Sequence, residues 1–319
     1  MAETQDIEVA ESTKPCEICN GRMMTTPITQ EFCRCAKCGF MLRKSDKYRP
    51  ADESYSQTSR IGSIKQLNHL RLKNIERTLK RRLGRYLSFK KPLKICEIGF
   101  AEGFLVERFA QQGHIVWGIE LDKHYYESVL QKMGSFENVT LHCGRLEDVI
   151  LPPEFFDLVY AIDVVEHLSD LNSTIEKVAK SIGVGGYLFL ETPNGDAQRE
   201  MRLFKDSWSH FKDPTHREIF TSKSIKILLQ SCGFEVIRID KPIIQSITFE
   251  ARSILIYLNA DFQNPLIKLL LIPLLSAFLF PARVIILPHN RPNMQIVARR
   301  NSNKTNSQVV FNLNTIYSD

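Results

Sequence analysis

The chain has 319 residues, of which 43% are hydrophobic and 24% are charged. That length and apolar content suffice for one large globular domain with a smaller second one, and they exclude an intrinsically disordered chain. The net charge of +6 permits an acidic partner but does not require one.

Residues 1–14 carry acidic side chains and no apolar run. They predict a disordered tail rather than a secretory signal. Without an export signal, we expect a cytoplasmic protein whose eight cysteines are reduced thiols or metal ligands.

Cysteines crowd residues 15–45, where the sequence reads CEIC and, after fifteen further residues, CAKC. Each Cys-x-x-Cys turn can aim two thiolates at one point, and two such turns supply the four sulfurs that tetrahedral Zn²⁺ prefers. These residues predict a structural zinc ribbon, with a redox Cys-x-x-Cys pair or chance clustering as the alternative. The proposed zinc ligands are Cys16, Cys19, Cys35 and Cys38. Cys33 is the surplus thiol, although it could exchange roles with Cys35.

Residues 46–92 are predicted to form a linker and a basic amphipathic helix. Between Arg60 and Lys91, apolar residues recur at spacings of three to five, and Lys and Arg crowd the other face. A nucleic-acid surface is one interpretation, but from Arg60 to Arg85 no aromatic side chains are interleaved with the charges. A solvated connecting helix is therefore favoured, and nucleic acid is not the expected partner. Anionic lipid or a phosphorylated substrate would suit the same charge.

From Lys94 onward, short apolar runs alternate with helical stretches. This alternation predicts an α/β fold, a doubly wound, Rossmann-like parallel sheet that binds its ligand at the carboxyl ends of the strands. The predicted strands are 93–98, 114–120, 139–143, 156–162, 186–191 and 234–239. The predicted helices are 104–112, 123–133, and two near 173–181 and 222–231.

The first of these strands ends in EIGFAEG, which resembles a nucleotide-binding turn but lacks one glycine. Gly99 turns the chain out of the strand and Gly103 lets the next helix pack closely, whereas Ala101 stands where a dinucleotide fold needs glycine beside a pyrophosphate. A cofactor without phosphate tolerates a methyl group there, and the carboxylate of Glu97 would suit a cation. Glu120, which ends the next strand, is placed to accept hydrogen bonds from two ribose hydroxyls. The cofactor that these residues would accept has a ribose, a positive charge and no phosphate, and S-adenosylmethionine has all three properties. The alternative is that EIGFAEG is an ordinary tight turn that binds no cofactor.

Further motifs follow the later strands, namely GRLED, FDLVYAIDVVEHL and GGYLFLETPN. With EIGFAEG they resemble class I S-adenosylmethionine-dependent methyltransferases, and DVVEHL resembles the ubiquinone-type O-methyltransferases in particular. The resemblance spans about residues 93–300, and the zinc ribbon with its tyrosine-containing linker resembles bacterial members found with glycan biosynthesis. It implies a seven-stranded sheet whose last strand, near residues 294–298, is antiparallel. The expected cofactor-binding residues are Glu97, Gly99, Ala101, Gly103, Glu120, Leu121, Leu146, Glu147 and Asp163.

Two histidines are candidate bases. Methyl transfer to a hydroxyl needs two aligned reactants and a group that removes a proton. His167 lies in the DVVEHL loop and His216 in WSHFKDPTHREIF, and the resemblance indicates DPTHREIFT as a lid over the acceptor pocket. The alternatives are structural hydrogen bonding for His167 and helix capping or loop packing for His216.

Residues 241–290 lie outside the common sheet and contain LLLIPLLSAFLFPARVIILP. The uncharged run 269–282 is shorter than the roughly twenty residues that span a bilayer, and Pro273 and Pro281 are expected to interrupt a helix. We predict either a hydrophobic hairpin over the acceptor pocket or an insertion into one leaflet, with association at a membrane surface slightly favoured. Residues 291–300 then form the last strand, and 301–319 a tail.

The sequence therefore predicts a methyltransferase core over residues 93–240 that O-methylates a glycan or a lipid-linked small molecule. An RNA or protein methyltransferase and a non-catalytic zinc adaptor are the alternatives. After the fourth strand there is neither an Asn/Asp-Pro-Pro-aromatic loop for base N-methylation nor a nucleophilic Cys for RNA carbon methylation. The intact EIGFAEG turn argues against a dead site.

Overall fold

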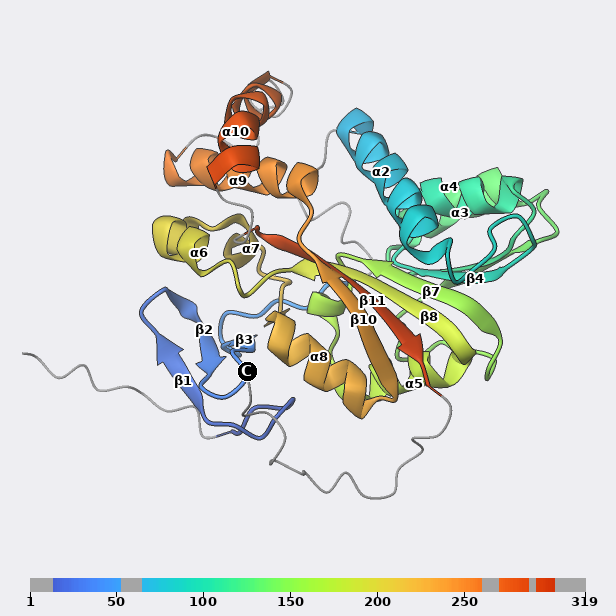
Figure 1. Ribbon diagram of the computed structural model, residues 1–319, viewed down its shortest axis with the longest axis horizontal. Coiled ribbons are helices and arrows are strands. Elements are labelled where there is room, and N and C mark those ends of the chain that lie inside the picture. Colours follow the sequence, from blue (N-terminus) through green and yellow to red (C-terminus); the bar gives the residue numbers. More distant parts are fainter. Residues whose placement is uncertain (1–13, 53–64, 260–269, 287–290, 302–319) are drawn as a thin grey trace, which may run out of the picture.

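The computed structural model describes residues 14–52, 65–259, 270–286 and 291–301. Over these ranges the chain forms a seven-stranded sheet with helices on both faces and a four-stranded sheet beside it (Figure 1). The two predicted tails lie outside the described residues, except for Lys14 and Asn301, and so do residues 53–64 of the predicted linker.

The seven strands of the main sheet follow the order β10-β11-β8-β7-β4-β5-β6. In chain order they are β4 (Lys94–Ile98), β5 (Ile115–Glu120), β6 (Val139–Cys143), β7 (Phe156–Ile162), β8 (Ile182–Pro193), β10 (Phe234–Asp240) and β11 (Asn293–Arg300). Strands β4 to β8 pair in parallel, whereas β11 is antiparallel to both β8 and β10. The predicted α/β sheet with an antiparallel last strand is confirmed. The strand order reverses at β4, where sheets of this kind bind ligands at the carboxyl edge.

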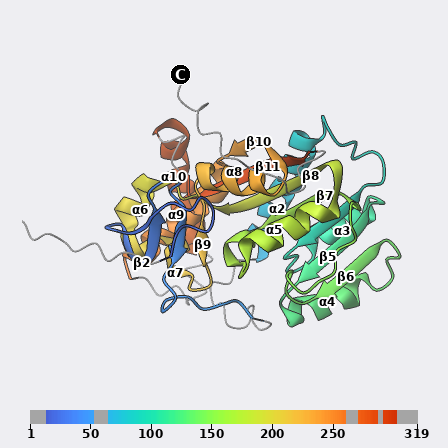
Figure 2. The same ribbon diagram turned by 90° about the horizontal axis from the view of Figure 1, so that it is seen from below.

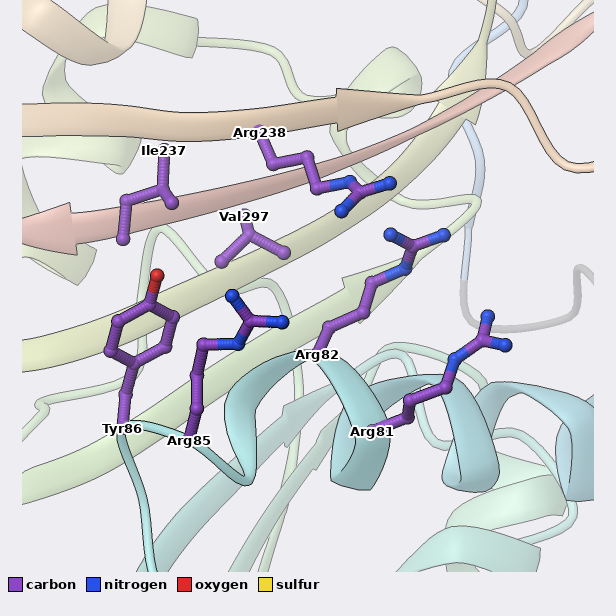
Figure 3. Close-up of a pocket in the computed structure, with 7 residues that line it drawn as sticks. All are labelled: Arg81, Arg82, Arg85, Tyr86, Ile237, Arg238 and Val297. Atoms are coloured by element: carbon purple, nitrogen blue, oxygen red, sulfur yellow. The ribbon is translucent and has the colours of Figure 1, made fainter.

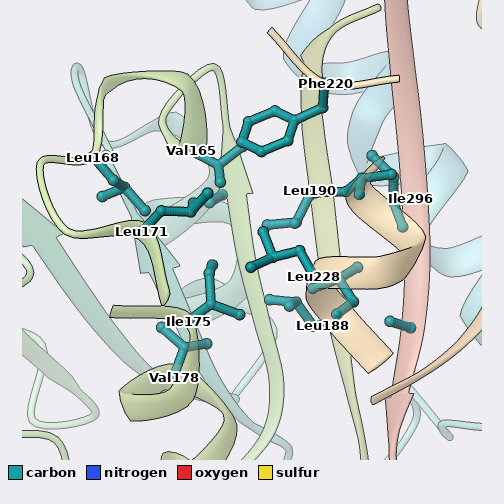
Figure 4. Packing of buried hydrophobic residues seen from close by; sticks show 14 of the residues in the cluster. Val165, Leu168, Leu171, Ile175, Val178, Leu188, Leu190, Phe220, Leu228 and Ile296 are labelled. Atoms are coloured by element: carbon teal, nitrogen blue, oxygen red, sulfur yellow. The ribbon is translucent and has the colours of Figure 1, made fainter. Parts of the chain in front are cut away.

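Helices cover both faces of this sheet (Figure 2). One face carries α2 (Lys65–Leu83), α3 (Phe104–Gln111) and α4 (Lys123–Met133), and the other carries α5 (Leu171–Ser181) and α8 (Ser222–Ser231). Alternate residues of one strand feed the two apolar cores. In β8, Tyr187 and Phe189 pack on the α2–α3 side, whereas Leu188 and Leu190 pack against α5 and α8 (Figure 4). Burial on both faces explains the unbroken apolar run in this strand.

Several element boundaries differ from the predicted ones, and the largest difference is at the start of β8. Strand β8 begins at Ile182, four residues before the predicted start, because Ile182 pairs with Phe156 across a shift in register. The glycines that follow Ile182 concealed this part of the strand in the sequence. Helix α5 begins at Leu171, where the side chain of Asp170 caps it by accepting a hydrogen bond from the Ser173 amide at 3.4 Å.

The smaller sheet combines a segment near the N-terminus with two residues of the core domain. Its strands are β1 (Met23–Thr26), β2 (Thr29–Cys35), β3 (Met41–Arg43) and β9 (Glu218–Ile219), in that order. Strand β9 comes from the loop region after β8, and it pairs antiparallel with β3 through Met41 and Ile219. The cysteine-rich segment therefore shares a sheet with the core domain, which the sequence did not predict.

The segment between β8 and β9 contains α6 (Gln198–Phe204), the 3₁₀ turn η2 (Lys205–Ser207) and α7 (Ser209–Lys212). Residues 209–219 overlap the stretch that is predicted to cover the acceptor pocket, and on that prediction we call them the acceptor loop. It shares an apolar core with the cysteine-rich segment, where the ring centroids of Phe32 and Phe211 lie 5.1 Å apart and Trp208 is fully buried. The acceptor loop therefore packs against the smaller, four-stranded sheet.

The described parts of residues 241–290 form two packed helices, α9 (Ile243–Tyr257) and α10 (Ile272–Ile286), which we call the α9–α10 hairpin and which pack through Ala251, Leu255 and Ile272. Residues 260–269 and 287–290 of the predicted insertion lie outside the described residues. The expectation that Pro281 interrupts a helix is wrong, because Pro281 lies inside α10. Its exposed position lets solvent reach the carbonyl group that the missing N–H leaves unpaired. None of the helices within the described ranges is both long enough and apolar enough to cross a bilayer.

Candidate functional site

The turn after β4 explains the glycine pattern. Gly99 and Gly103 adopt φ angles of 76° and 69°, and a Cβ atom on them would lie 2.4 Å from Val164 Cγ2 and 2.7 Å from Val129 Cγ1. Neither position can hold a side chain. Ala101 also adopts a left-handed backbone, with a φ of 46°. The alanine is therefore tolerated, in a conformation that L-residues other than glycine disfavour.

Two buried carboxyl groups lie at the ends of the adjacent strands β4 and β5. Glu97 is 4% exposed and accepts a hydrogen bond from the Tyr160 hydroxyl at 2.9 Å. Burial and, to a smaller extent, the neighbouring Glu120 raise the pKa of Glu97 to about 8, although the Tyr160 hydrogen bond acts in the opposite direction. Burial also raises the pKa of Glu120, although backbone amides partly compensate. A cationic ligand at this edge would favour the charged form of both groups.

Glu120 already bonds to the backbone around it. Its Oε2 accepts from the Ala101 amide at 2.7 Å, and its Oε1 accepts from the Asp122 amide at 2.9 Å. Each carboxylate oxygen keeps a second lone pair, so ribose hydroxyls can still donate to it. The same bonds fix the glycine turn against the end of β5.

The other expected cofactor residues lie on the loops along this edge. Leu121 directly follows β5, and Asp163 directly follows β7 with a left-handed φ of 54°. Leu146 is buried in the α5-side core, and Glu147 Oε1 accepts from the Ser169 amide at 3.1 Å, which joins the loops after β6 and β7. Their contact with a cofactor stays a prediction.

The two histidines proposed as bases come together. Nδ1 of His167, in the 3₁₀ turn η1 (Val165–His167), lies 2.9 Å from the Thr215 carbonyl oxygen, and Nδ1 of His216 lies 2.9 Å from the His210 carbonyl oxygen. A carbonyl oxygen can only accept, so each Nδ1 carries the proton and each Nε2 keeps its lone pair. The two ring centroids are 4.8 Å apart.

The electrostatic surroundings distinguish these histidines. Burial lowers the pKa of His167 to about 4, and repulsion from His216 contributes. Nε2 of His216 lies 3.8 Å from Asp213 Oδ2. Burial alone would raise the pKa of Asp213, but His216 and the Thr215 hydroxyl outweigh it and lower that pKa to about 2. Asp213 is therefore ionised at neutral pH, and its carboxylate can stabilise a proton on His216.

Two further side chains complete this cluster. Glu166 is fully buried, accepts a hydrogen bond from the Thr192 hydroxyl at 3.0 Å, and has its pKa raised well above normal by burial and then by Asp163. Its carboxylate lies within 4.8 Å of the ring nitrogens of His167 and His216, a donor set that a divalent cation could also use. His210 is also buried, and its Nε2 donates a hydrogen bond to Asn293 Oδ1 at 3.0 Å.

Arg43 is the residue that sequence reasoning missed. It lies at the end of β3, its side chain is 1% exposed, and its guanidinium pairs with Glu31. It also donates to three carbonyl oxygens of the acceptor loop, those of Phe211 at 2.8 Å, Asp213 at 2.7 Å and His216 at 2.7 Å. No local sequence pattern predicts these three contacts, because the carbonyl groups lie at least 168 positions away from Arg43 in the chain.

The four predicted zinc ligands converge. The Sγ atoms of Cys16 and Cys38 are 3.7 Å apart, those of Cys19 and Cys35 are 3.5 Å apart, and all four lie within 4.8 Å of one another. Tetrahedral Zn–S bonds of about 2.3 Å place sulfurs about 3.8 Å apart, so the thiols fit Zn²⁺. Cys33 lies on β2 outside this group. The Thr221 hydroxyl donates to the Cys38 carbonyl at 2.6 Å, which ties the cluster to the core domain.

Sequence comparisons agree with this geometry. A family model described as a methyltransferase domain matches residues 67–239, more than half of the chain. The chain is 28% identical over 148 residues to a ubiquinone biosynthesis O-methyltransferase of Chelativorans sp., covering 45% of this chain and 58% of the relative. It is 32% identical over 128 residues to a tRNA U34 carboxymethyltransferase of Desulfotalea psychrophila, covering 39% and 40%. The chain thus spans less than two thirds of the length of these curated relatives.

Solved structures share the fold. A candidate sarcosine dimethylglycine methyltransferase from Galdieria sulphuraria superposes with a TM-score of 0.51 at 13% identity, covering 72% of this chain and 86% of the other. Phosphoethanolamine N-methyltransferase 2 of Haemonchus contortus, in complex with S-adenosyl-L-methionine, gives a TM-score of 0.50 at 16% identity and covers 69% and 51%. With the family match over residues 67–239, the sheet order and the glycine turn at the end of β4, this chain belongs to the methyltransferase-domain family.

Proposed function

We propose that this protein transfers a methyl group from S-adenosylmethionine to a hydroxyl of a small-molecule acceptor, either a glycan or a lipid-linked compound. The observation that carries the proposal is the pair of histidines beside the carboxyl edge of β7, each with Nδ1 held by a backbone carbonyl and one next to Asp213. Such a pair can remove a hydroxyl proton as the methyl group is transferred.

The cofactor would bind across the ends of β4 and β5. When bound, it supplies an electrophilic methyl group on a sulfonium. The buried carboxylate of Glu97 would face the positive end of this ligand, and Glu120 would accept from its ribose. The left-handed turn at Gly99 and Gly103 keeps the backbone clear of side chains where the cofactor would lie.

His216 would act as the base. Its Nδ1–H is held by the His210 carbonyl, so Nε2 takes the acceptor proton, and the ionised Asp213 stabilises the resulting imidazolium. His167, whose pKa burial lowers to about 4, would orient the acceptor by hydrogen bonding.

The α9–α10 hairpin supports an apolar or lipid-linked acceptor. Phe249 of α9 packs on His210 with ring centroids 4.5 Å apart, which places the hairpin next to the acceptor loop. Leu274 and Phe278 of α10 are 64% and 80% exposed. Exposed apolar side chains at this spacing suit peripheral association with a membrane surface.

The four thiols of Cys16, Cys19, Cys35 and Cys38 would hold one structural Zn²⁺. All four positions around such an ion are filled by protein, so the ion would stabilise the small sheet rather than take part in catalysis. Through Arg43 this sheet also holds the acceptor loop.

The test uses labelled S-adenosylmethionine and mass spectrometry of cell extracts to find the methylated product. Turnover of that acceptor should fall about 100-fold to 10,000-fold in His216→Gln, which keeps a hydrogen-bonding side chain but cannot act as a base. Cofactor affinity should stay within twofold. Turnover of His216→Gln within a few-fold of the parent would refute the assignment. A parallel assay with EDTA shows whether a bound cation, rather than the imidazole, activates the hydroxyl.

An RNA acceptor is the second candidate, because one relative is named a tRNA U34 carboxymethyltransferase and the last turn of α2 carries Lys80, Arg81 and Arg82. The same labelling experiment separates the two candidates. Label in the RNA fraction that disappears after ribonuclease treatment would favour RNA, and label in the organic or glycan fraction would favour the small-molecule acceptor.

A further inference from the structure

A cavity of about 290 Å³ lies between the end of α2 and the strands β10 and β11, and four arginines line it (Figure 3). Arg81, Arg82 and Arg85 come from α2 and its C-terminal end, and Arg238 comes from β10. The guanidinium groups of Arg82 and Arg238 lie near each other, and the side chain of Arg85 extends from the end of the helix toward Val297 (Figure 3). Helix and strand thus present positive charge to one recess.

The positive charge in this cavity is only partly neutralised. Arg82 Nη1 and Arg238 Nε lie 2.6 Å and 2.8 Å from the same Asp240 oxygen. Among the described residues that line the cavity, none is acidic, and Arg81 and Arg85 form no ion pair with any residue that the structure describes. Burial lowers the pKa of Arg82, and repulsion from Arg238 and Arg81 acts in the same direction. An anion in the recess would remove this repulsion.

The shape and chemistry of the lining select the kind of anion. Guanidinium groups bind phosphate oxygens in pairs, and several of them lining one cavity suit a group with several oxygens. Ile237 and Val297 provide an apolar floor, and the Tyr86 ring, stacked on Tyr187 at 5.5 Å, brings a hydroxyl donor to the rim. We propose that this cavity binds the phosphate or diphosphate group of a ligand.

The position of the cavity separates it from the cofactor site. Strand β10 is four places from β4 in the sheet, which is about 19 Å at the usual spacing of strands. A recess for one phosphate-bearing group also differs from a nucleic-acid surface, which needs a stripe of positive charge along successive phosphates. The ligand is therefore a phosphorylated small molecule or a lipid headgroup, and the experiment distinguishes these two sources.

The test measures binding to the full-length protein by calorimetry with inorganic phosphate and inorganic diphosphate, and by sedimentation with vesicles of phosphatidylcholine alone or with phosphatidic acid. Arg85→Gln and Arg238→Gln should each weaken binding about tenfold or more, because each removes a charged donor. Arg77→Gln is the matched control, since Arg77 is an exposed arginine of the same helix outside the cavity, and it should change binding less than twofold. Thermal unfolding confirms that each variant is folded. Arg85 is exposed, so its replacement keeps the test valid if Arg238→Gln is unstable.

Two outcomes support the site. Diphosphate binding that Arg85→Gln weakens assigns a soluble phosphorylated ligand. Binding only to vesicles with phosphatidic acid, lost in Arg85→Gln, assigns a lipid headgroup. Absence of binding to all probes, or an equal loss in Arg77→Gln, would overturn the proposal. No methyl transfer is measured, so the result is independent of the proposed activity.

Discussion

Replacement of Arg43 by lysine tests whether the cysteine-rich sheet positions the acceptor loop. The arginine fork reaches three carbonyl oxygens, those of Phe211, Asp213 and His216. A lysine ammonium is a compact charge on a flexible stem and cannot span three separate carbonyls. We therefore expect Arg43→Lys to keep the positive charge beside Glu31 but to lose at least two of the hydrogen bonds to the loop.

The expected magnitude follows from those bonds. Hydrogen bonds from a charged donor contribute about 1.5 kcal/mol each at the low end, so the loss of two costs about 3 kcal/mol. If the free energy of local opening of the acceptor loop falls by that amount, amide hydrogen exchange over residues 209–219 becomes about 150-fold faster. S-adenosylmethionine affinity should change less than twofold, because the glycine turn after β4 makes none of these contacts.

Hydrogen exchange read by mass spectrometry provides the measurement and needs no knowledge of the acceptor. Arg49→Lys is the matched control, because the exposed Arg49 guanidinium donates to the carbonyls of Asp46 and Tyr48 rather than to the loop. Unchanged exchange over residues 209–219 in Arg43→Lys would refute the positioning role. Equal acceleration throughout the main sheet would also refute it, since that pattern indicates global destabilisation.

Three further predictions concern the metal and cofactor sites. Elemental analysis should find one zinc per chain, which is lost in Cys16→Ser and kept in Cys33→Ser. The opposite result would show that Cys33 is a zinc ligand and Cys16 is not. Ala101→Gly should raise the free energy of unfolding in urea by up to about 1 kcal/mol, because it relieves a left-handed alanine, whereas a loss of stability would contradict this view of the turn. Because burial raises the pKa of Glu97 to about 8, its carboxyl is mostly protonated at pH 7 and ionised at pH 9, so calorimetry should show about tenfold tighter S-adenosylmethionine binding at pH 9. Glu97→Gln should remove this dependence, and a flat profile for the parent protein would count against a cationic ligand at Glu97.

The periodic parts of the fold could be predicted from the sequence. Strands such as β7 and β8 contain uninterrupted apolar runs, and helices such as α4 have an apolar face and a capping residue, so local patterns determine them. The glycine turn could also be predicted, because Gly99 and Gly103 occupy positions where no side chain fits. The thiol cluster followed from its spacing.

The contacts between distant segments could not be predicted. Strand β9 has two residues and carries no strand signal of its own, and it forms only because β3 offers a free edge. The meeting of His167 with His216 and the reach of Arg43 depend on the same packing. Cys143 is exposed because β6 lies at the edge of the sheet, although a cysteine in an apolar segment is usually buried. Pro281 is a case in which a local pattern gave a wrong prediction. A proline was expected to interrupt the helix, but at this exposed position solvent can bond to the carbonyl group that the proline leaves unpaired.

The pairing of β3 with β9 also sets an order of events during synthesis. The cysteine-rich segment leaves the ribosome about 175 residues before its partner strand, a delay of about 10 to 35 s at usual translation rates. During that interval Phe32 and Met41 lack the apolar partners that Trp208, Phe211 and Ile219 later provide. Nascent chains that end before residue 208 should therefore bind hydrophobic-surface chaperones through residues 29–43, and release should follow once residue 219 has emerged.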